Sequence, residues 1–262
     1  MGGILLVHGG LHGPWCWDDF VRRLTQRGHD VRAVQLRGHD QPRGRIWHRV
    51  RDYQEDVEHA AAQFAEPPVL VGHSLGGLLV QRHLEQHEGA GAVLMASIPP
   101  RGMLPAALRL AIRHPLVLLR VNLSLSLRPF LSSPRVVRDI LYSARTPDET
   151  IERCMARMQD ESYLAFLDML WVLPRPRRVR APVLVLGAEL DNIFKRREIL
   201  ATARAYRTEA EFFPGMGHNM MLERGWEAVA DRVDGWVRET VRPSKTAPIV
   251  RHVDSVSAPA GR

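Results

Sequence analysis

Short apolar runs recur along the chain, and between them apolar residues return every three or four positions. Continuous runs typical of strands buried on both faces occur at Ile4 to Val7, Val31 to Val34, Val69 to Val71, Ala92 to Ala96, Val183 to Leu186 and Glu211 to Phe213. Helical periodicity occurs at Trp15 to Arg27, Arg51 to Ala65, Leu75 to Gln86, Arg196 to Ala205 and Arg224 to Val241. Strands that alternate with helices predict an α/β fold with a doubly wound, mostly parallel sheet of about six strands.

A long segment between the fourth and fifth predicted strands, from about Ile98 to Leu173, is not needed to build the sheet. Its composition is helical and rich in apolar residues. An insertion at this point is expected to form a cap over the carboxyl ends of the strands and to line a pocket there. We therefore expect a core at residues 1–97 and 174–242 and a helical cap at residues 98–173. Residues 243–262 lack apolar periodicity, so a flexible extension is expected there.

The segment Gly72-His73-Ser74-Leu75-Gly76 is a G-x-S-x-G pattern that follows an apolar strand and precedes a helix-forming run. A serine on so tight a turn adopts a strained backbone and exposes its hydroxyl above the sheet, while the two glycines let the chain pass close to itself. The pattern alone is weak, because chance often supplies it. Its position between a buried strand and a helix predicts that Ser74 is a catalytic nucleophile.

A nucleophilic serine needs a general base and an acid that orients the base. His218 is the candidate base, because it lies on a glycine-rich loop directly after the last predicted strand. Asp191 is the candidate acid, since it leaves the carboxyl end of the fifth strand. Glu189 leaves that strand two residues earlier and is the alternative.

The tetrahedral intermediate of acyl transfer needs hydrogen-bond donors for its oxyanion. We expect one donor to be the N–H of Leu75, directly after the nucleophile, and the other to be the N–H of Gly10, in the loop after the first strand. An ordinary strand-ending turn is the alternative interpretation of Gly9 and Gly10. If the first strand lies between the second and the third, the topology brings this loop next to Ser74.

The run from His8 to Trp17 and the motif around Ser74 resemble the α/β-hydrolase superfamily, over residues 1–240. The N-terminal run looks most like the plant methylesterase and hydroxynitrile lyase branch and its bacterial relatives, and the order Ser, Asp, His is that of the superfamily. The lyases of that branch place a threonine at the position of Gly9 and a lysine at that of Asn219, so cyanohydrin cleavage is not expected. Epoxide hydrolases and haloalkane dehalogenases of the superfamily use an aspartate nucleophile, and Ser74 argues against both.

Of the reactions known in the superfamily, these arguments leave acyl transfer through a covalent serine ester. We therefore predict a carboxylic-ester hydrolase with water as the usual acceptor. A thioesterase, a lactonase or a cofactor-free perhydrolase would use the same residues, and a ligand-binding protein on a hydrolase scaffold is the alternative from another class. The substrate is expected to be a small ester with an apolar acyl or alcohol part. The residues predicted to contact it are Leu11, Met216, Met220 and Trp171. His8 and His73 are expected to brace the two loops, and a place in the pocket wall is the alternative for each.

The 262 residues carry a formal net charge of +7, with 36 Lys and Arg spread through every segment. This distribution favours a solvated surface over a nucleic-acid partner. The sequence contains no metal-binding cluster and no phosphate-binding glycine loop, so neither a metal nor another cofactor is expected. Cys16 and Cys154 form no disulfide framework, and no signal-peptide pattern precedes the first strand, so the expected localisation is cytoplasmic.

The apolar segment from Leu104 to Leu131 is interrupted by arginines and a proline, so no transmembrane span is expected. Basic residues border its apolar face, which leaves contact with a membrane surface open. The sequence does not determine the oligomeric state.

Overall fold

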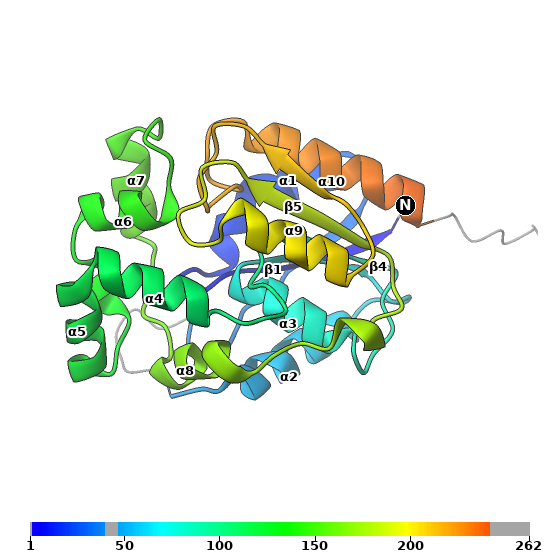
Figure 1. The fold of residues 1–262 in the computed structure, drawn as a ribbon. Coiled ribbons are helices and arrows are strands. Elements are labelled where there is room, and N and C mark those ends of the chain that lie inside the picture. The colour runs from blue at the N-terminus through cyan, green and yellow to red at the C-terminus, as the bar shows by residue number, and fades with distance from the viewer. Residues whose placement is uncertain (1, 40–46, 242–262) are drawn as a thin grey trace, which may run out of the picture.

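The computed structural model describes residues 2–39 and 47–241. Its centre is a six-stranded sheet in the order β2-β1-β3-β4-β5-β6, in which every neighbouring pair is parallel (Figure 1). The strands are β1 (Gly3–Val7), β2 (Asp30–Ala33), β3 (Val69–His73), β4 (Gly91–Met95), β5 (Val183–Ala188) and β6 (Ala210–Phe213). The predicted parallel sheet is confirmed, with its first strand between the second and the third.

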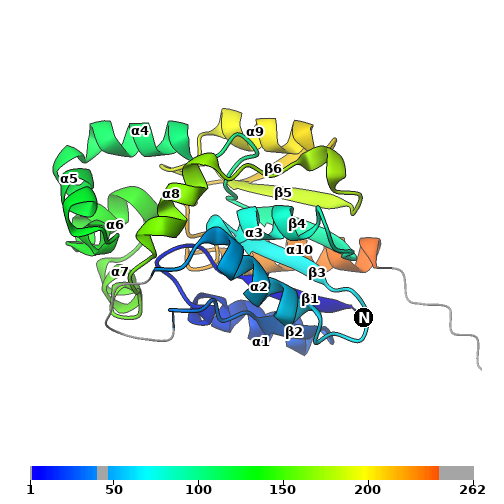
Figure 2. The same ribbon diagram turned by 90° about the horizontal axis from the view of Figure 1, so that it is seen from below.

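Helices cover both faces of the sheet (Figure 2). The helices α1 (Asp18–Gln26) and α10 (Trp226–Thr240) bury their apolar sides in one cluster with the sheet. The helices α2 (Val50–Ala61), α3 (Leu75–His83) and α9 (Arg196–Ala205) contribute to a second cluster on the opposite face. This division explains the apolar runs, because β3, β4 and β5 are buried along their whole length between the two helix layers.

The helices predicted for the core are all present, but some of their ends differ from the predictions. The first begins as the short 3₁₀ turn η1 (Pro14–Trp17) before α1. The second ends at Ala61 rather than Ala65, and the third at His83 rather than Gln86, because the chain turns there toward the next strand.

The segment between β4 and β5 is a helical insertion, as expected from its composition. Its elements are α4 (Leu104–Arg113), α5 (Pro115–Ser124), η2 (Arg128–Leu131), α6 (Pro134–Leu141), α7 (Asp148–Met155) and α8 (Tyr163–Trp171), followed by η3 (Pro176–Arg178). The insertion gathers at the end of the sheet where the strands have their carboxyl ends (Figures 1 and 2). In parallel α/β sheets this is the edge at which ligands bind.

Three further expectations concern the chain as a whole. The extension predicted at residues 243–262 lies outside the described residues. Cys16 and Cys154 are both buried and unbridged, in agreement with the predicted lack of a disulfide framework. Within residues 2–39 and 47–241, no helix is long and apolar enough to cross a membrane.

Candidate active site

Ser74 occupies the turn between β3 and α3 in a strained backbone conformation. Its φ is 52° and its ψ is −114°, a backbone conformation that residues with a Cβ rarely adopt. Two backbone hydrogen bonds hold the turn, since Ser74 N–H donates to the Met95 carbonyl at 3.2 Å and Ile98 N–H donates to the Ser74 carbonyl at 3.2 Å. The backbone of Ser74, the predicted nucleophile, is therefore held in place by the end of the neighbouring strand β4 and the residues that follow it.

The two glycines of the motif permit a close approach of backbone segments. A Cβ at Gly76 would lie 2.1 Å from the carbonyl oxygen of Val7, and a Cβ at Gly72 would lie 2.5 Å from that of Gly76. Both distances are shorter than any real carbon–oxygen contact. Only glycine lets α3 start directly against the end of β1, so the pattern has a steric origin in this fold.

His218 and Asp191 form a buried hydrogen-bonded pair. His218 Nδ1 donates to Asp191 Oδ2 at 2.9 Å. The other oxygen, Oδ1, accepts the N–H groups of Ile193 at 2.7 Å and Phe194 at 2.9 Å, so the loop after β5 fixes the carboxylate plane. A neutral imidazole that carries its proton on Nδ1 has Nε2 free to accept one. His218 has the bonding of a general base.

The alternative acid, Glu189, occupies a different position. Its side chain is exposed, and Oε2 accepts the N–H of Gly215 at 2.8 Å. Glu189 thus supports the loop that carries His218, whereas Asp191 contacts the imidazole itself.

A cavity under the helical insertion brings the predicted residues together. Ser74, His218, Gly10, Leu75 and Leu11 all line it. Leu75 is the first residue of α3, so its N–H has no hydrogen-bond acceptor within the helix. This N–H lies at the positive end of the helix dipole. Gly10 approaches from the loop after β1, as the strand order requires.

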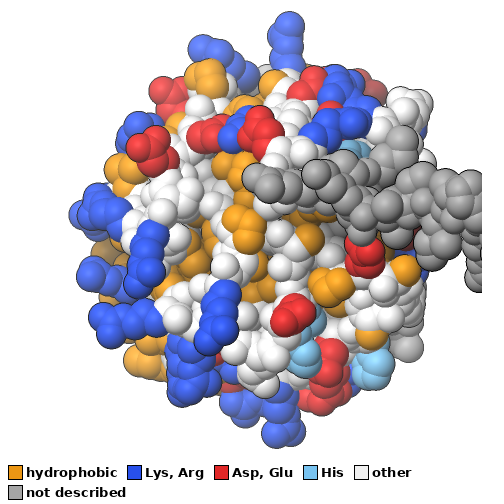
Figure 3. Space-filling view, turned by 90° about the vertical axis from the view of Figure 1, so that its right-hand side faces the viewer, with side chains coloured by type: hydrophobic (Ala, Val, Ile, Leu, Met, Phe, Trp, Pro, Cys, Tyr) orange, Lys and Arg blue, Asp and Glu red, His pale blue; other side chains and the backbone are white. Residues whose placement is uncertain are grey.

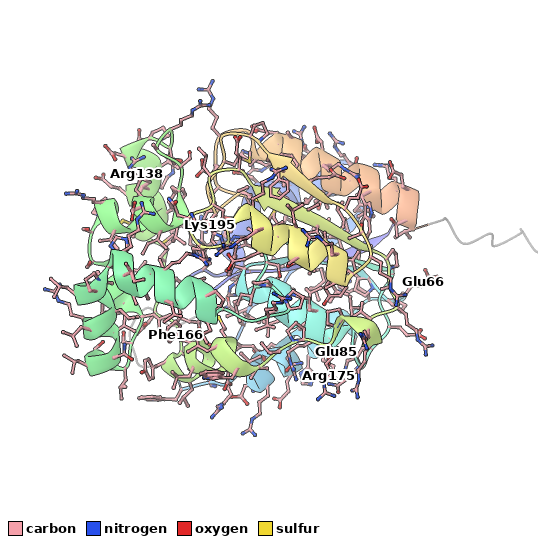
Figure 4. The ribbon with its side chains drawn as sticks, in the orientation of Figure 1. Glu66, Glu85, Arg138, Phe166, Arg175 and Lys195 are labelled. Atoms are coloured by element: carbon pink, nitrogen blue, oxygen red, sulfur yellow. The ribbon has the colours of Figure 1, made fainter. Side chains whose placement is uncertain are left out.

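The rest of the cavity wall is largely apolar and comes mostly from the insertion. The apolar side chains that line it are Met103, Leu110, Leu127, Phe130, Val137, Ile140, Leu141, Phe166 and Met169, together with Ile193. Phe166, labelled in Figure 4, extends from α8 on the lower side of the insertion in that view. An apolar wall around a few convergent polar groups is typical of a small-molecule site.

The profile of the alpha/beta hydrolase family matches residues 4–232. The chain belongs to the alpha/beta hydrolase family. It is similar to the esterase PIR7B of Oryza sativa subsp. japonica, with 36% identity over 104 residues, which cover 37% of this chain and 38% of the relative. It is also similar to methylesterase 10 of Arabidopsis thaliana, with 32% identity over 112 residues, which cover 40% of each chain. The chain thus matches only about two fifths of the length of these distant relatives.

Solved structures of esterases and lipases share the fold over most of their length. A monoacylglycerol lipase from Paleococcus ferrophilus superposes with a TM-score of 0.69 at 22% identity, covering 92% of this chain and 95% of the lipase. Polyneuridine aldehyde esterase superposes with a TM-score of 0.67 at 18% identity, covering 90% and 99%. At these identities the likeness establishes the fold.

A hydrogen-bond chain that the sequence did not predict joins the His218 loop to the Gly10 loop. His12 Nδ1 donates to the Gly10 carbonyl at 2.7 Å, and the side-chain amide of Asn219 donates to His12 Nε2 at 3.2 Å. Burial lowers the pKa of His12 to about 4, so the ring is neutral at pH 7 and suits both bonds. The Gly10–Leu11 peptide, which adjoins the Gly10 N–H across its Cα, is therefore held from the residue after His218.

His73 and His8 occupy the positions of braces. His73 Nε2 donates to the His218 carbonyl at 3.0 Å, and the two rings lie 4.7 Å apart. His8 bonds to the Gly9 carbonyl and packs edge-on against His39. Burial lowers the pKa of both His8 and His73 well below the usual value, so neither ring adds charge to the site at neutral pH.

A second unpredicted feature is a buried cluster around Glu161, which reaches the cavity beside Gly10. Glu161 Oε2 contacts His39 Nε2 at 3.1 Å, and Oε1 accepts the Tyr53 hydroxyl at 2.7 Å and the Ser162 N–H at 2.7 Å. Burial alone would raise the pKa of Glu161, but the positive charge and hydrogen bonds of its partners outweigh burial and lower it. Likewise burial opposes the charge of His39, yet the Glu161 carboxylate raises its pKa.

Three of the predicted substrate contacts lie elsewhere. Met216 and Met220 are buried in the cluster that α1 and α10 form with the sheet, whereas the cavity opens among side chains of the opposite cluster. Trp171 stands at the end of α8 with 69% of its surface exposed. Of the four side chains predicted to bind substrate, Leu11 is the one that lines the cavity with Ser74.

Two further observations bear on possible partners. Among the described residues, no group of three or more His, Cys, Asp or Glu side chains could hold a metal ion. Figure 3 views the side of the molecule away from the insertion, where acidic and basic side chains mix along the upper edge and basic ones predominate at the left and lower left.

Proposed function

We propose that this hydrolase cleaves carboxylic esters through a covalent acyl-Ser74 intermediate. The observation that carries the proposal is the buried His218–Asp191 hydrogen bond at the edge of a cavity that also contains Ser74 on its strained turn. A serine hydroxyl is a weak nucleophile without such a base, and a base without the carboxylate would take the wrong tautomer.

In the first half of the reaction, Ser74 Oγ bonds to the substrate carbonyl carbon while His218 Nε2 takes the hydroxyl proton. The carbonyl oxygen becomes an oxyanion, held by the N–H groups of Gly10 and Leu75. Asp191 keeps the His218 proton on Nδ1 and stabilises the imidazolium. The tetrahedral intermediate then collapses, the bond to the alcohol oxygen breaks, and His218 gives its proton to the departing alcohol.

In the second half, water attacks the acyl-enzyme and His218 takes a proton from it. The same two N–H groups hold the second oxyanion. Collapse returns the proton to Ser74 and releases the carboxylic acid, so the enzyme ends in its starting state.

The substrate we propose is an ester with an apolar part that fills the cavity under the insertion. The wall contributed by α4, α6 and α8 is apolar, and each methylene buried there contributes about 0.8 kcal/mol. The resemblance to proteins described as methylesterases is consistent with a small alcohol as leaving group. Thioesters and lactones would react by the same steps, so a substrate panel should include both.

The test uses a fluorophosphonate probe together with variants at the two carboxylates that follow β5. Wild-type protein should be labelled on the peptide that contains Ser74, and Ser74→Ala should lose both labelling and ester hydrolysis while keeping its fold. Asp191→Asn should lower kcat by about 10⁴, as expected for a misoriented tautomer. Glu189→Gln is the matched control, and its kcat should stay close to wild type.

Two results would count against the proposal. A collapse of activity in Glu189→Gln with normal activity in Asp191→Asn would transfer the role of the acid to Glu189. A wild type that neither labels nor hydrolyses any ester, thioester or lactone would leave the cavity as a binding site on a hydrolase scaffold.

A further inference from the structure

Two consecutive helices of the insertion expose an unusual number of large apolar side chains. Of the ten large apolar side chains exposed in the described part of the chain, five lie on α4 and α5. The five are Leu108, Ile112, Leu116, Leu119 and Leu123, and we call them the α4–α5 face. Ile112 is 83% exposed and Leu123 is 77% exposed. Single exposed leucines are common on protein surfaces, but a group of this kind marks an interaction site.

The spacing of these residues makes one surface of them. Leu108 and Ile112 are four residues apart on α4, and Leu116 and Leu123 are seven residues apart on α5, which are helical repeats. The two helices pack against each other, with His114 between them. In Figure 1, α5 lies at the far left of the insertion, and α4 runs from there toward α9.

The α4–α5 face is anchored to the core. Arg109, in the middle of α4, makes two hydrogen bonds to the Glu198 carboxylate of α9, at 3.0 and 2.6 Å, and a third to the Ile193 carbonyl. The inner side of the same helix carries Leu110, which lines the cavity. The face is therefore preformed, and only the thickness of α4 separates it from the proposed active site.

The part of the sequence that carries this face is predominantly basic, although Asp139 of α6 pairs with Arg113 and His114 where α4 meets α5. Between Glu88 and Asp139 the sequence contains no Asp or Glu but contains seven arginines. Three of these, Arg101 before α4, Arg120 on α5 and Arg135 on α6, are exposed and form no ion pair within the described residues. An apolar surface that carries the unpaired Arg120 within a basic segment matches a layer that is apolar inside and negatively charged at its surface.

We propose that the α4–α5 face docks on a lipid bilayer that carries anionic headgroups. The leucine and isoleucine side chains enter the interfacial region, and the arginines around them contact lipid phosphates. A second copy of the chain fits less well, because two such faces together would bring unpaired arginines of like charge into contact. Docking brings the cavity close to a phase in which an apolar ester dissolves; this last step rests on the proposed function.

Vesicle flotation tests the docking separately from catalysis. Wild-type protein should float with vesicles of phosphatidylcholine and phosphatidylglycerol, and binding should weaken with phosphatidylcholine alone and at high salt. The variant Ile112→Ser/Leu116→Ser/Leu123→Ser should bind the mixed vesicles at least about tenfold more weakly, because it exposes far less apolar area to insert. Arg120→Gln should retain binding but depend less on the anionic lipid.

Matched variants separate the possible outcomes. Leu173→Ser removes an exposed leucine outside the α4–α5 face and should bind like wild type. Ser74→Ala should also bind like wild type, and the triple variant should still hydrolyse a water-soluble ester, so failure of docking and failure of catalysis are distinguishable. The proposal is overturned if wild-type protein does not float with the mixed vesicles, or if the triple variant floats equally well. It is also overturned if size-exclusion chromatography shows that wild type and the control variants are dimers while the triple variant is a monomer.

Discussion

The buried pair of Glu161 and His39 gives a stability prediction whose size and pH dependence both follow from the structure. The side chains of both residues are fully buried, and their Nε2 and Oε2 atoms lie 3.1 Å apart. Removing one partner of such a pair leaves a buried charge without compensation, which costs about 3 to 5 kcal/mol. For a protein of this length, each kcal/mol lowers Tm by roughly 2–4 °C. Glu161→Gln should therefore lower Tm by roughly 6–20 °C where the pair is charged.

The pH at which the loss is largest follows from the two pKa shifts. The pKa of Glu161 is lowered from its usual 4.5, so its contribution is complete above pH 4.5 and disappears as the pH falls through the lowered value. The pKa of His39 is raised from its usual 6.5, so its contribution is complete below pH 6.5 and disappears as the pH rises through the raised value. The pair stabilises the fold most between pH 4.5 and 6.5.

The assay is thermal unfolding of wild type and Glu161→Gln by circular dichroism, at about pH 6 and about pH 9. At the lower pH the protonated His39 ring can only donate, so it cannot accept a hydrogen bond from the amide N–H₂ of the glutamine. At the higher pH the neutral ring can accept that hydrogen bond. The difference in Tm should shrink at high pH. Tyr53→Phe is the control, because it removes one hydrogen bond to the carboxylate, worth about 1.5 to 3 kcal/mol, and leaves Glu161 and His39 in place, so its loss of Tm should be similar at the two pH values.

Equal Tm losses for Glu161→Gln at the two pH values would refute the argument. They would mean that the carboxylate acts through its hydrogen bonds with Tyr53 and Ser162 and that His39 stays neutral.

Three other predictions concern the turn, the loop contact and the cavity. Gly76→Ala should lower the free energy of unfolding, measured in urea, by about 3 kcal/mol or more, because the added Cβ would clash with the Val7 carbonyl. Gly235→Ala on α10 is the control: a Cβ there would meet no atom within 4 Å, so the variant should be neutral or more stable by about 0.5–1 kcal/mol. Asn219→Leu should lower kcat for esters by about tenfold or more without loss of fluorophosphonate labelling at long times, because the Gly10–Leu11 peptide next to the donor N–H loses its support through His12. An unchanged kcat would show that this hydrogen-bond chain does not position Gly10. Among p-nitrophenyl esters, kcat/KM should rise as the acyl chain lengthens from acetate, and a preference for acetate would contradict an apolar acyl site.

The residues that the sequence revealed are those whose role depends on local geometry. A turn from strand to helix that carries a serine needs glycines on both sides, and the pattern of Gly72, Ser74 and Gly76 records that steric requirement directly. The alternation of apolar runs with helical periodicity specified the parallel sheet, because strands buried on both faces must be apolar throughout. The sequence left the order of strands as a condition; the structure has the first strand between the second and the third, and this order places the Gly10 loop beside Ser74.

The contacts that only the tertiary structure decided join residues far apart in the chain. Glu161 meets His39 across 122 positions and Asn219 meets His12 across 207, and no local pattern records such a pairing. Met216 and Met220 flank His218 in sequence yet point into the cluster on the opposite face of the sheet, because neighbours on a loop need not share a direction. Periodicity and motifs record the local conformation and burial that a few consecutive residues require. The wall of the cavity depends instead on how α4, α6 and α8 of the insertion pack over the sheet, and that is set by packing of the whole chain.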